Sequence, residues 1–128
     1  MKTDGPKRDQ RKKLGKEAEE AVAEYLCRDG YELVERNFEC KIGEVDIIAR
    51  KGECLCFVEV RSRSTEAMGS PALTVNARKQ RQVVRAALWY LSKNEITNMV
   101  ARFDVAAVTF GPLGPEIEYI PSAFDAGM

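Results

Sequence analysis

The order of hydrophobic and polar positions predicts a helix and three strands in the first half of the chain. From Leu14 to Cys27, apolar residues recur at three- and four-residue spacing, which is typical of a helix with one buried face. Residues 31–38 and the two halves of the segment 43–64 have the short apolar runs of strands. Lys51-Gly52 separates those two halves, so we expect them to form a hairpin.

The second half of the chain predicts another helix and two further strands. Ser70 and Pro71 are typical signals for the start of a helix, which we expect to run to about Asn94. Apolar runs at 100–110 and 117–120 predict the last two strands. The buried stripe expected for the second helix consists of Val84, Ala87, Leu88 and Leu91. This order of elements predicts an α/β fold with a mixed sheet.

A chain of 128 residues has the size of one domain. Residues 1–12 are polar and charged, which indicates a flexible basic arm, and residues 13–128 would form the single domain. No run of apolar residues is long enough to cross a membrane, and no apolar segment follows the charges of the N-terminus. We therefore expect a cytoplasmic protein with no membrane partner.

The sequence contains no histidine and four cysteines. The lack of histidine excludes Ser-His-Asp and Cys-His catalysis. No C-x-x-C pair is present. Cys54 and Cys56 are two positions apart, so their side chains are expected on the same face of a strand. We therefore interpret the cysteines as small buried apolar residues rather than as metal or redox ligands. Any catalysis must use carboxylates, other polar side chains or a metal ion.

Two acidic residues interrupt the apolar runs of the predicted hairpin. Asp46 and Glu59 lie among Val, Ile and Phe, where an unpaired charge is costly. If Arg50 and Glu53 face each other across the turn, Asp46 and Glu59 are diagonal neighbours, roughly 7–8 Å apart on one face. Arg61 shares that face. Two interpretations are open: carboxylates paired with Arg61 and Arg50, or a metal site.

A third carboxylate favours the metal site. In the first helix, Glu19 shares its face with the apolar residues Val22 and Leu26, so its side chain is directed inward. Three inward carboxylates, Glu19, Asp46 and Glu59, with no histidine match the all-oxygen ligands that Mg²⁺ or Mn²⁺ prefers.

The net charge of the chain is zero, but the charges are unevenly distributed. Residues 1–13 contain six basic and two acidic residues, and residues 61–85 contain six basic residues and one acidic residue. Such clusters suit a polyanion, and no base-reading motif is present, so we expect sequence-independent contacts with the DNA backbone. The candidate phosphate-binding residues are Lys12, Lys13, Arg63, Arg78, Lys79, Arg81 and Arg85.

Five segments together resemble the YraN family of bacterial proteins: LGKEAEEAVAEYL, GEVDIIA, FVEVRSRS, NARKQRQVVRAALWYL and RFDV. The resemblance covers about residues 14–124. That family is placed with the archaeal Holliday-junction resolvases in the restriction-endonuclease-like, PD-(D/E)XK superfamily. The resemblance implies a mixed β-sheet flanked by helices with an αβββαβ core.

The resemblance also implies a function. It assigns the acidic site residues to Glu19, Asp46 and Glu59, and the usual lysine of the superfamily to the position of Arg61. The implied function is that of a metal-dependent DNA endonuclease that acts on branched or recombination and repair intermediates. The resemblance also implies a homodimer, which would match the two equivalent strands of a four-way junction. Arg61 departs from the pattern because a guanidinium does not release its proton. The alternative is a catalytically inactive nuclease-fold protein with a nucleic-acid-binding or assembly role.

Overall fold

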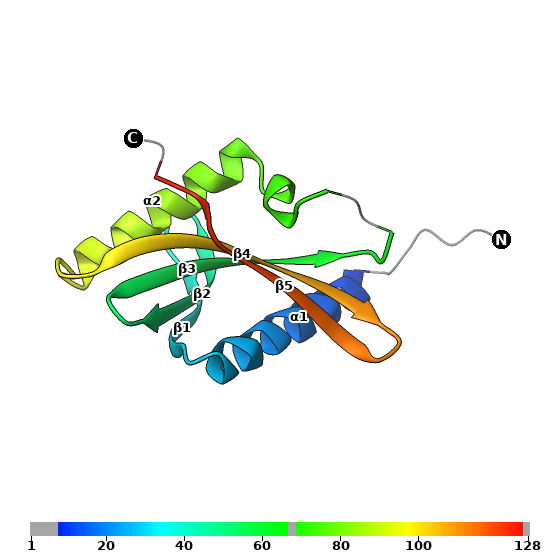
Figure 1. The fold of residues 1–128 in the computed structure, drawn as a ribbon. Helices are drawn as coiled ribbons and strands as arrows, with labels where there is room; N and C mark the ends of the chain where they lie inside the picture. The colour runs from blue at the N-terminus through cyan, green and yellow to red at the C-terminus, as the bar shows by residue number, and fades with distance from the viewer. Residues whose placement is uncertain (1–7, 67–68, 127–128) are drawn as a thin grey trace.

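The part of the chain that the structure describes forms helices and strands in the predicted order (Figure 1). The structure is a computed structural model, and it describes residues 8–66 and 69–126. The elements are α1 (Arg8–Arg28), β1 (Glu32–Glu39), β2 (Glu44–Lys51), β3 (Cys54–Arg63), the 3₁₀ turn η1 (Pro71–Thr74), α2 (Ala77–Lys93), β4 (Val100–Gly111) and β5 (Gly114–Phe124). The predicted α/β fold with a mixed sheet is confirmed.

The strands of these described ranges form one five-stranded sheet in the order β1-β2-β3-β4-β5. Neighbouring strands are antiparallel except β3 and β4, which run parallel from the pair Cys54–Val100 to the pair Arg63–Thr109. Parallel strands cannot be joined by a tight turn, so the chain crosses over through η1 and α2 (Figure 1). β5 is longer than the predicted strand at 117–120, because it pairs with β4 along most of its length.

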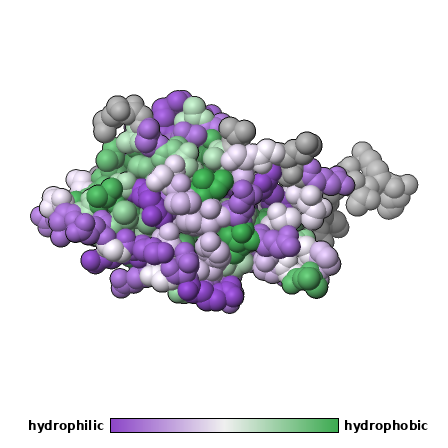
Figure 2. All heavy atoms as spheres, in the orientation of Figure 1, coloured by the Kyte–Doolittle hydropathy of each residue, from purple (hydrophilic) through white to green (hydrophobic). Residues whose placement is uncertain are grey.

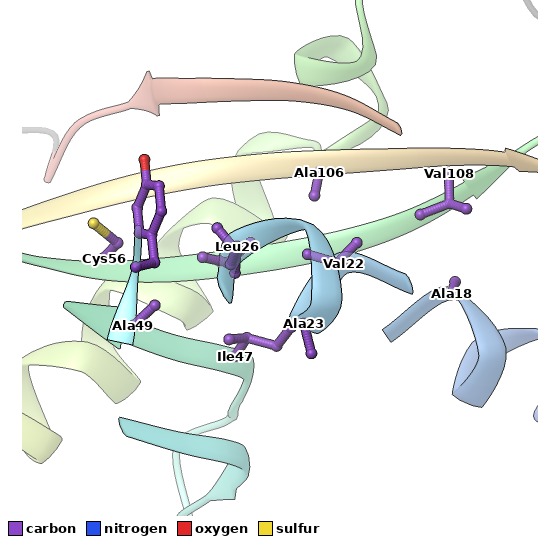
Figure 3. Close-up of a cluster of buried hydrophobic side chains, with 11 residues drawn as sticks. Ala18, Val22, Ala23, Leu26, Ile47, Ala49, Cys56, Ala106 and Val108 are labelled. Atoms are coloured by element: carbon purple, nitrogen blue, oxygen red, sulfur yellow. The ribbon is translucent and has the colours of Figure 1, made fainter. Parts of the chain in front are cut away.

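The two helices cover opposite faces of the sheet. Leu26 of α1 packs against Ile47 and Val58 in one buried cluster. Figure 3 shows the α1 side chains of this cluster directed at the strands. Ile48 and Phe57, the neighbours of those strand residues, belong to the cluster under α2. This alternation follows from the two-residue period of a β-strand, and it means that a strand residue can be reached only from its own face unless the strands separate.

The β2–β3 hairpin has a different register from the one predicted. Lys51 pairs with Cys54, so the turn consists of Gly52 and Glu53 rather than Lys51 and Gly52. Gly52 has a φ of +61°, which glycine adopts without strain. Extending the observed register places Asp46 directly opposite Glu59. The shift is two residues, so both acids still share a face.

Two predicted boundaries are wrong. α1 begins at Arg8, so residues 8–12 of the predicted arm are helical, and residues 1–7 lie outside the described residues. Ser70 and Pro71 begin η1 rather than α2, and Asn76 caps α2 through its side chain. The helix-forming propensity of Arg, Gln and Lys explains the early start of α1, and the second cap explains why the 3₁₀ turn and α2 are separate.

α2 buries only part of the predicted stripe: Val84 and Ala87 are buried as expected, whereas Leu88 is not. The residues of α2 that are buried are Val83, Val84, Ala86, Ala87 and Tyr90. This face of α2 is directed at the sheet, because the Tyr90 ring packs edge-on against Phe38 and Phe57. Leu88 and Trp89 are instead 49% and 48% exposed.

The surface drawn in Figure 2 is mainly hydrophilic, and hydrophobic residues gather toward the α2 side of that face. Within the described ranges, no helix is both long and apolar enough to cross a bilayer. We expect the polar residues that matter for function to lie where the two acidic strand residues, Asp46 and Glu59, meet.

Candidate active site at the fork of two strands

Asp46 lies where β2 and β3 separate. Backbone pairing between the two strands ends at Ile47 and Val58, and beyond it the N–H of Val60 donates to Asp46 Oδ2 at 2.8 Å. A side-chain carboxylate thus replaces the backbone carbonyl that a continuous ladder would supply. Burial raises the pKa of Asp46, although the Val60 N–H and the charge of Lys79 partly oppose this rise.

Glu59 is the second carboxylate of the site, and it is only 3% exposed. Its Oε1 atom is buried and has no hydrogen-bond partner among the described residues. Burial, followed by the charge of Asp46, raises the pKa of Glu59 to about 7. A buried carboxylate with a free oxygen needs a proton or a cation, so the site is chemically incomplete as it stands.

The nearest cation to Glu59 is Lys79, which comes from α2. Lys79 Nζ lies 3.6 Å from Glu59 Oε2, and its side chain is 25% exposed. The backbone N–H of Lys79 donates to the Asn76 cap at 2.9 Å, which fixes the start of the helix beside the sheet. The sequence placed Lys79 among the phosphate-binding residues. Its position four residues before the buried Val83 was the available signal that it points toward the sheet.

Arg61 is the third charged group on this face. Its charge lowers the pKa values of Asp46 and Glu59, and its Nε atom is buried without a partner in the described part of the chain. Arg50, the other predicted partner, donates instead to the Gly52 carbonyl at 3.3 Å. Of the two arginines in the purely structural interpretation, Arg61 therefore acts on both acids through its charge, whereas Arg50 is bonded elsewhere.

Glu19 approaches Asp46 from the α1 face. Burial, and then the charge of Asp46, raises the pKa of Glu19, whereas a hydrogen bond from the Asn37 side chain lowers it. Asn37 lies in β1 between the pairs Arg36–Ile47 and Phe38–Val45, and therefore opposite Asp46. Its φ of 54° is uncommon outside glycine but tolerated by asparagine. The sequence analysis missed Asn37, for which the signal was an asparagine within a predicted strand.

A second buried carboxylate in the fold shows what a completed structural site looks like. Asp104 is 0% exposed and accepts hydrogen bonds from Arg102, the Tyr119 hydroxyl and the Ser122 N–H. Its charge is matched by the Arg102 guanidinium, with a shortest N–O distance of 2.8 Å. Glu59 has fewer hydrogen bonds than Asp104 and a more distant cation, at 3.6 Å rather than 2.8 Å, so the Asp46–Glu59 pair is the candidate site.

The donor atoms of the site fit a hard divalent cation. Asp46 and Glu59 offer carboxylate oxygens, and the buried Oε1 of Glu59 is a ligand atom with no hydrogen-bond partner in the part of the chain that the structure describes. Among the described residues, no three His, Cys, Asp or Glu side chains come close enough together to hold a metal ion. Asp46 and Glu59 form the close pair, and Glu19 interacts with Asp46 through its charge.

The predicted phosphate-binding residues lie around the fold rather than in one cluster. Those that are exposed are Lys12, Lys13, Arg78, Arg81 and Arg85. Arg63 is mostly buried, because it donates to the Gly69 carbonyl at 3.0 Å and lies 3.8 Å from Glu118. Of this predicted set, Lys79 is the residue whose charge acts on both carboxylates.

Comparison with known proteins gives a consistent family. Residues 18–108 match the uncharacterised protein family UPF0102. A UPF0102 protein of Geobacter metallireducens is 46% identical over 114 residues, which are 89% of this chain and 93% of the relative. One from Geotalea uraniireducens is 48% identical over 115 residues, covering 89% and 91%. One from Myxococcus xanthus is 41% identical over 119 residues, covering 93% and 94%. The matched range contains the whole Asp46–Glu59 site.

Proposed function

This chain belongs to the uncharacterised protein family UPF0102, and from the chemistry of the Asp46–Glu59 site we propose that it is a metal-dependent endonuclease that hydrolyses phosphodiester bonds in DNA. The observation that carries this proposal is the buried, unpartnered oxygen of Glu59 beside a second carboxylate. The resemblance of the sequence motifs to the resolvase superfamily adds branched or recombination and repair intermediates as the substrate class.

The carboxylates would hold Mg²⁺ or Mn²⁺. Asp46 and Glu59 are the principal ligands, and Glu19 is the third acid, reaching from the α1 side. Such an ion, when bound, polarises a phosphate and lowers the pKa of coordinated water. The Val60 N–H orients Asp46 and the Asn37 amide orients Glu19, so that backbone and side-chain donors hold the ligands in place.

Arg61 and Lys79 would act on the phosphate. Arg61 is a permanent cation, so it binds and stabilises negative charge but does not remove a proton. Lys79 already lies beside Glu59 and supplies a second positive group from α2. Both cations come from rigid elements, β3 and α2, which suits the stabilisation of charge that develops during phosphodiester cleavage.

The exposed basic residues would hold DNA by its backbone. Lys12 and Lys13 on α1 and the basic residues of α2 carry charge without any base-reading arrangement, so binding depends on salt rather than on sequence. A homodimer on a four-way junction remains part of the proposal, because two equivalent strands suit a two-fold symmetric protein.

The alternative function is a catalytically inactive protein of nuclease-like fold, with a nucleic-acid-binding or assembly role. Two observations favour it: Arg61 occupies the position of the superfamily lysine, and no three potential ligands in the described ranges converge on one point. Against it stands the buried pair itself, because a protein that only binds DNA gains nothing from carboxylates beside a phosphate.

The deciding experiment incubates the full-length protein with linear, flapped and four-way DNA in Mn²⁺, in Mg²⁺ or in EDTA. We expect cleavage only with metal, and we expect Asp46→Asn and Glu59→Gln to abolish it while DNA affinity stays equal or rises. Glu24→Gln, an exposed change in α1, is the matched control. Equal cleavage by the wild type and both variants would refute the site.

Metal binding without DNA separates the two functions. Calorimetric titration with Mn²⁺ should show binding that both carboxylate variants lose, because ligands poised for catalysis bind the ion before substrate arrives. DNA binding with neither metal binding nor cleavage of any of these substrates would establish the alternative function instead.

A further inference from the structure

Two surface hollows adjoin along α2 and connect the proposed active site to a tryptophan. The first hollow is lined by Glu39, Cys40, Gly43, Glu44, Lys79 and Gln82. The second is lined by Glu39, Cys40, Lys41, Ile42 and Trp89. They share Glu39 and Cys40, so a continuous depression follows the β1–β2 loop from Lys79 to Trp89.

This depression follows one stripe of the helix. Residues at positions 79, 82, 86 and 89 are separated by three or four positions and therefore share a face of α2. The ten helical steps from Lys79 to Trp89 correspond to about 15 Å along the helix axis. Gly43 keeps the loop close to α2, because a Cβ at this position would lie 3.3 Å from the Gln82 carbonyl oxygen. The depression therefore has fixed walls.

Trp89 is unusual among the aromatic residues of this protein. Its side chain is 48% exposed, and it has no aromatic partner within the described ranges, whereas Tyr90 next to it packs in the core. One side of its hollow is apolar, formed by Ile42 and Cys40. Such a ring presents a flat apolar surface bordered by the lysine at position 41, which suits a planar ligand attached to an anionic chain.

We propose that Trp89 stacks on an unpaired base of a nucleic-acid strand whose phosphate lies at Lys79 and the carboxylate pair. The phosphate end of this arrangement rests on the proposed function. Phosphates of one strand lie at least about 3.4 Å apart, so four nucleotides or fewer cover the distance of about 15 Å. A base in a duplex hides its faces in the stack, so the substrate class is DNA with unpaired nucleotides, such as flaps and single strands.

The charges along the depression define how this strand would bind. Lys79 and Lys41 attract phosphates, whereas Glu39 and Glu44, which also line the depression, repel them. Electrostatic attraction is therefore nearly balanced here, and stacking on Trp89 supplies the preference for unpaired DNA over duplex.

Trp89 is the only tryptophan of the chain, so its fluorescence reports this site alone. Full-length protein in EDTA, where no metal-dependent cleavage occurs, is titrated with oligodeoxythymidylate and, separately, with a blunt duplex of the same length. The single strand should quench the tryptophan emission, and the duplex should leave it unchanged. Unchanged emission at saturating single strand would overturn the proposal.

Variants test whether the contact contributes affinity. Trp89→Ala should weaken binding of labelled oligodeoxythymidylate by about tenfold, measured by fluorescence anisotropy, and leave duplex binding unchanged. Trp89→Phe should retain most of the affinity. Leu88→Ala is the matched control, because Leu88 is equally exposed on the same helix but lines a different hollow. Thermal melts check that each variant is folded.

The outcomes separate this inference from the proposed function. An affinity for single strands that is the same in Trp89→Ala and wild type would overturn the stacking site, even if the protein cleaves DNA. An equal loss of single-strand and duplex binding would also overturn it, because stacking on a free base cannot explain the second loss. Selective loss of single-strand binding supports the site, even if no cleavage is found.

Discussion

Lys79 on α2 and Glu59 on β3 form an ion pair with an Nζ–Oε2 distance of 3.6 Å, and this pair connects a helix to the carboxylate site. Position 61, where a lysine was expected from the resemblance, holds an arginine. The lysine next to the carboxylates is thus Lys79, which comes from α2 and not from β3. The charge of Lys79 lowers the pKa values of both Asp46 and Glu59, so it contributes to keeping the two acids ionised.

Lys79→Ala should reduce cleavage by about two to three orders of magnitude, the usual effect of losing one donor to a transition state. The same variant should raise the pKa of Glu59 further, and therefore shift Mn²⁺ binding to higher pH. Ser92→Ala, an exposed change near the end of the same helix, should affect neither property. Matching cleavage rates for the two variants would exclude Lys79 from the site.

Stability should fall with rising pH because of Glu59. Its pKa rises from 4.5 to about 7 on folding, so the folded state holds this proton more tightly than the unfolded state. The free energy of unfolding should decrease between these pH values by about 3 kcal/mol at most. Urea unfolding across this range should show the decrease in the wild type, and a flatter profile in Glu59→Gln or with saturating Mn²⁺. Parallel profiles for wild type and Glu59→Gln would contradict the assignment.

Arg61 should be replaceable by a cation but not by a neutral group. Arg61→Ala should lower the cleavage rate by a factor that corresponds to about 2.7–4 kcal/mol, and Arg61→Lys should retain much of the activity because the charge remains. Single-turnover rates at saturating DNA measure this difference apart from binding. Comparable activity in the alanine and lysine variants would mean that Arg61 does not act on the phosphate.

Asn37 offers a matched pair of substitutions. Asn37→Gly removes the amide that holds Glu19 but tolerates the φ of 54°, whereas Asn37→Ala keeps a Cβ in that conformation without the asparagine amide and should cost about 1 kcal/mol of stability. Both variants should bind Mn²⁺ about 10–100-fold more weakly, the usual effect of losing an outer hydrogen bond to a metal ligand. Unchanged Mn²⁺ affinity in the folded glycine variant would remove Asn37 from the site.

Asp104 should matter for stability alone. Asp104→Asn leaves the Arg102 guanidinium without its buried partner, which should cost about 3–5 kcal/mol in urea unfolding. Asp29→Asn is the control, because Asp29 is exposed and its distance from Lys51 is 3.5 Å; the expected cost is less than about 1 kcal/mol. A small effect of the Asp104 change would show that its network is not structural.

The sequence predicted that Asp46 and Glu59 lie near each other even though the hairpin register was wrong. The true register differs by two residues, and an even shift leaves every side chain on the same face. The charge of Asp46 accordingly acts on Glu59, although the observed pairing ends at Ile47 and Val58. The α/β class was predictable for the same reason, because hydrophobic periodicity depends on local geometry and is insensitive to small errors of register.

The missed features all depend on contacts between distant parts of the chain. Periodicity does not show which turn of α2 meets Glu59, so the ion pair of Lys79 was not predicted. The Arg102 hydrogen bond to Tyr31 joins residues 71 positions apart, and no local pattern contains it. The positive φ of Asn37 arises where the strand changes the face that it buries, which is a tertiary effect.

The two-residue turn between β2 and β3 determines the order in which the charges of the site meet during folding. A hairpin closes within about 1–10 μs, and closing this one brings Asp46 and Glu59 together. Lys79 arrives only when α2 docks and the parallel pairing of β3 with β4 closes the crossover, a contact of longer range and therefore slower formation. In that interval the two acids face each other with no lysine nearby. Protons and divalent cations should consequently accelerate folding itself, and not only stabilise its product.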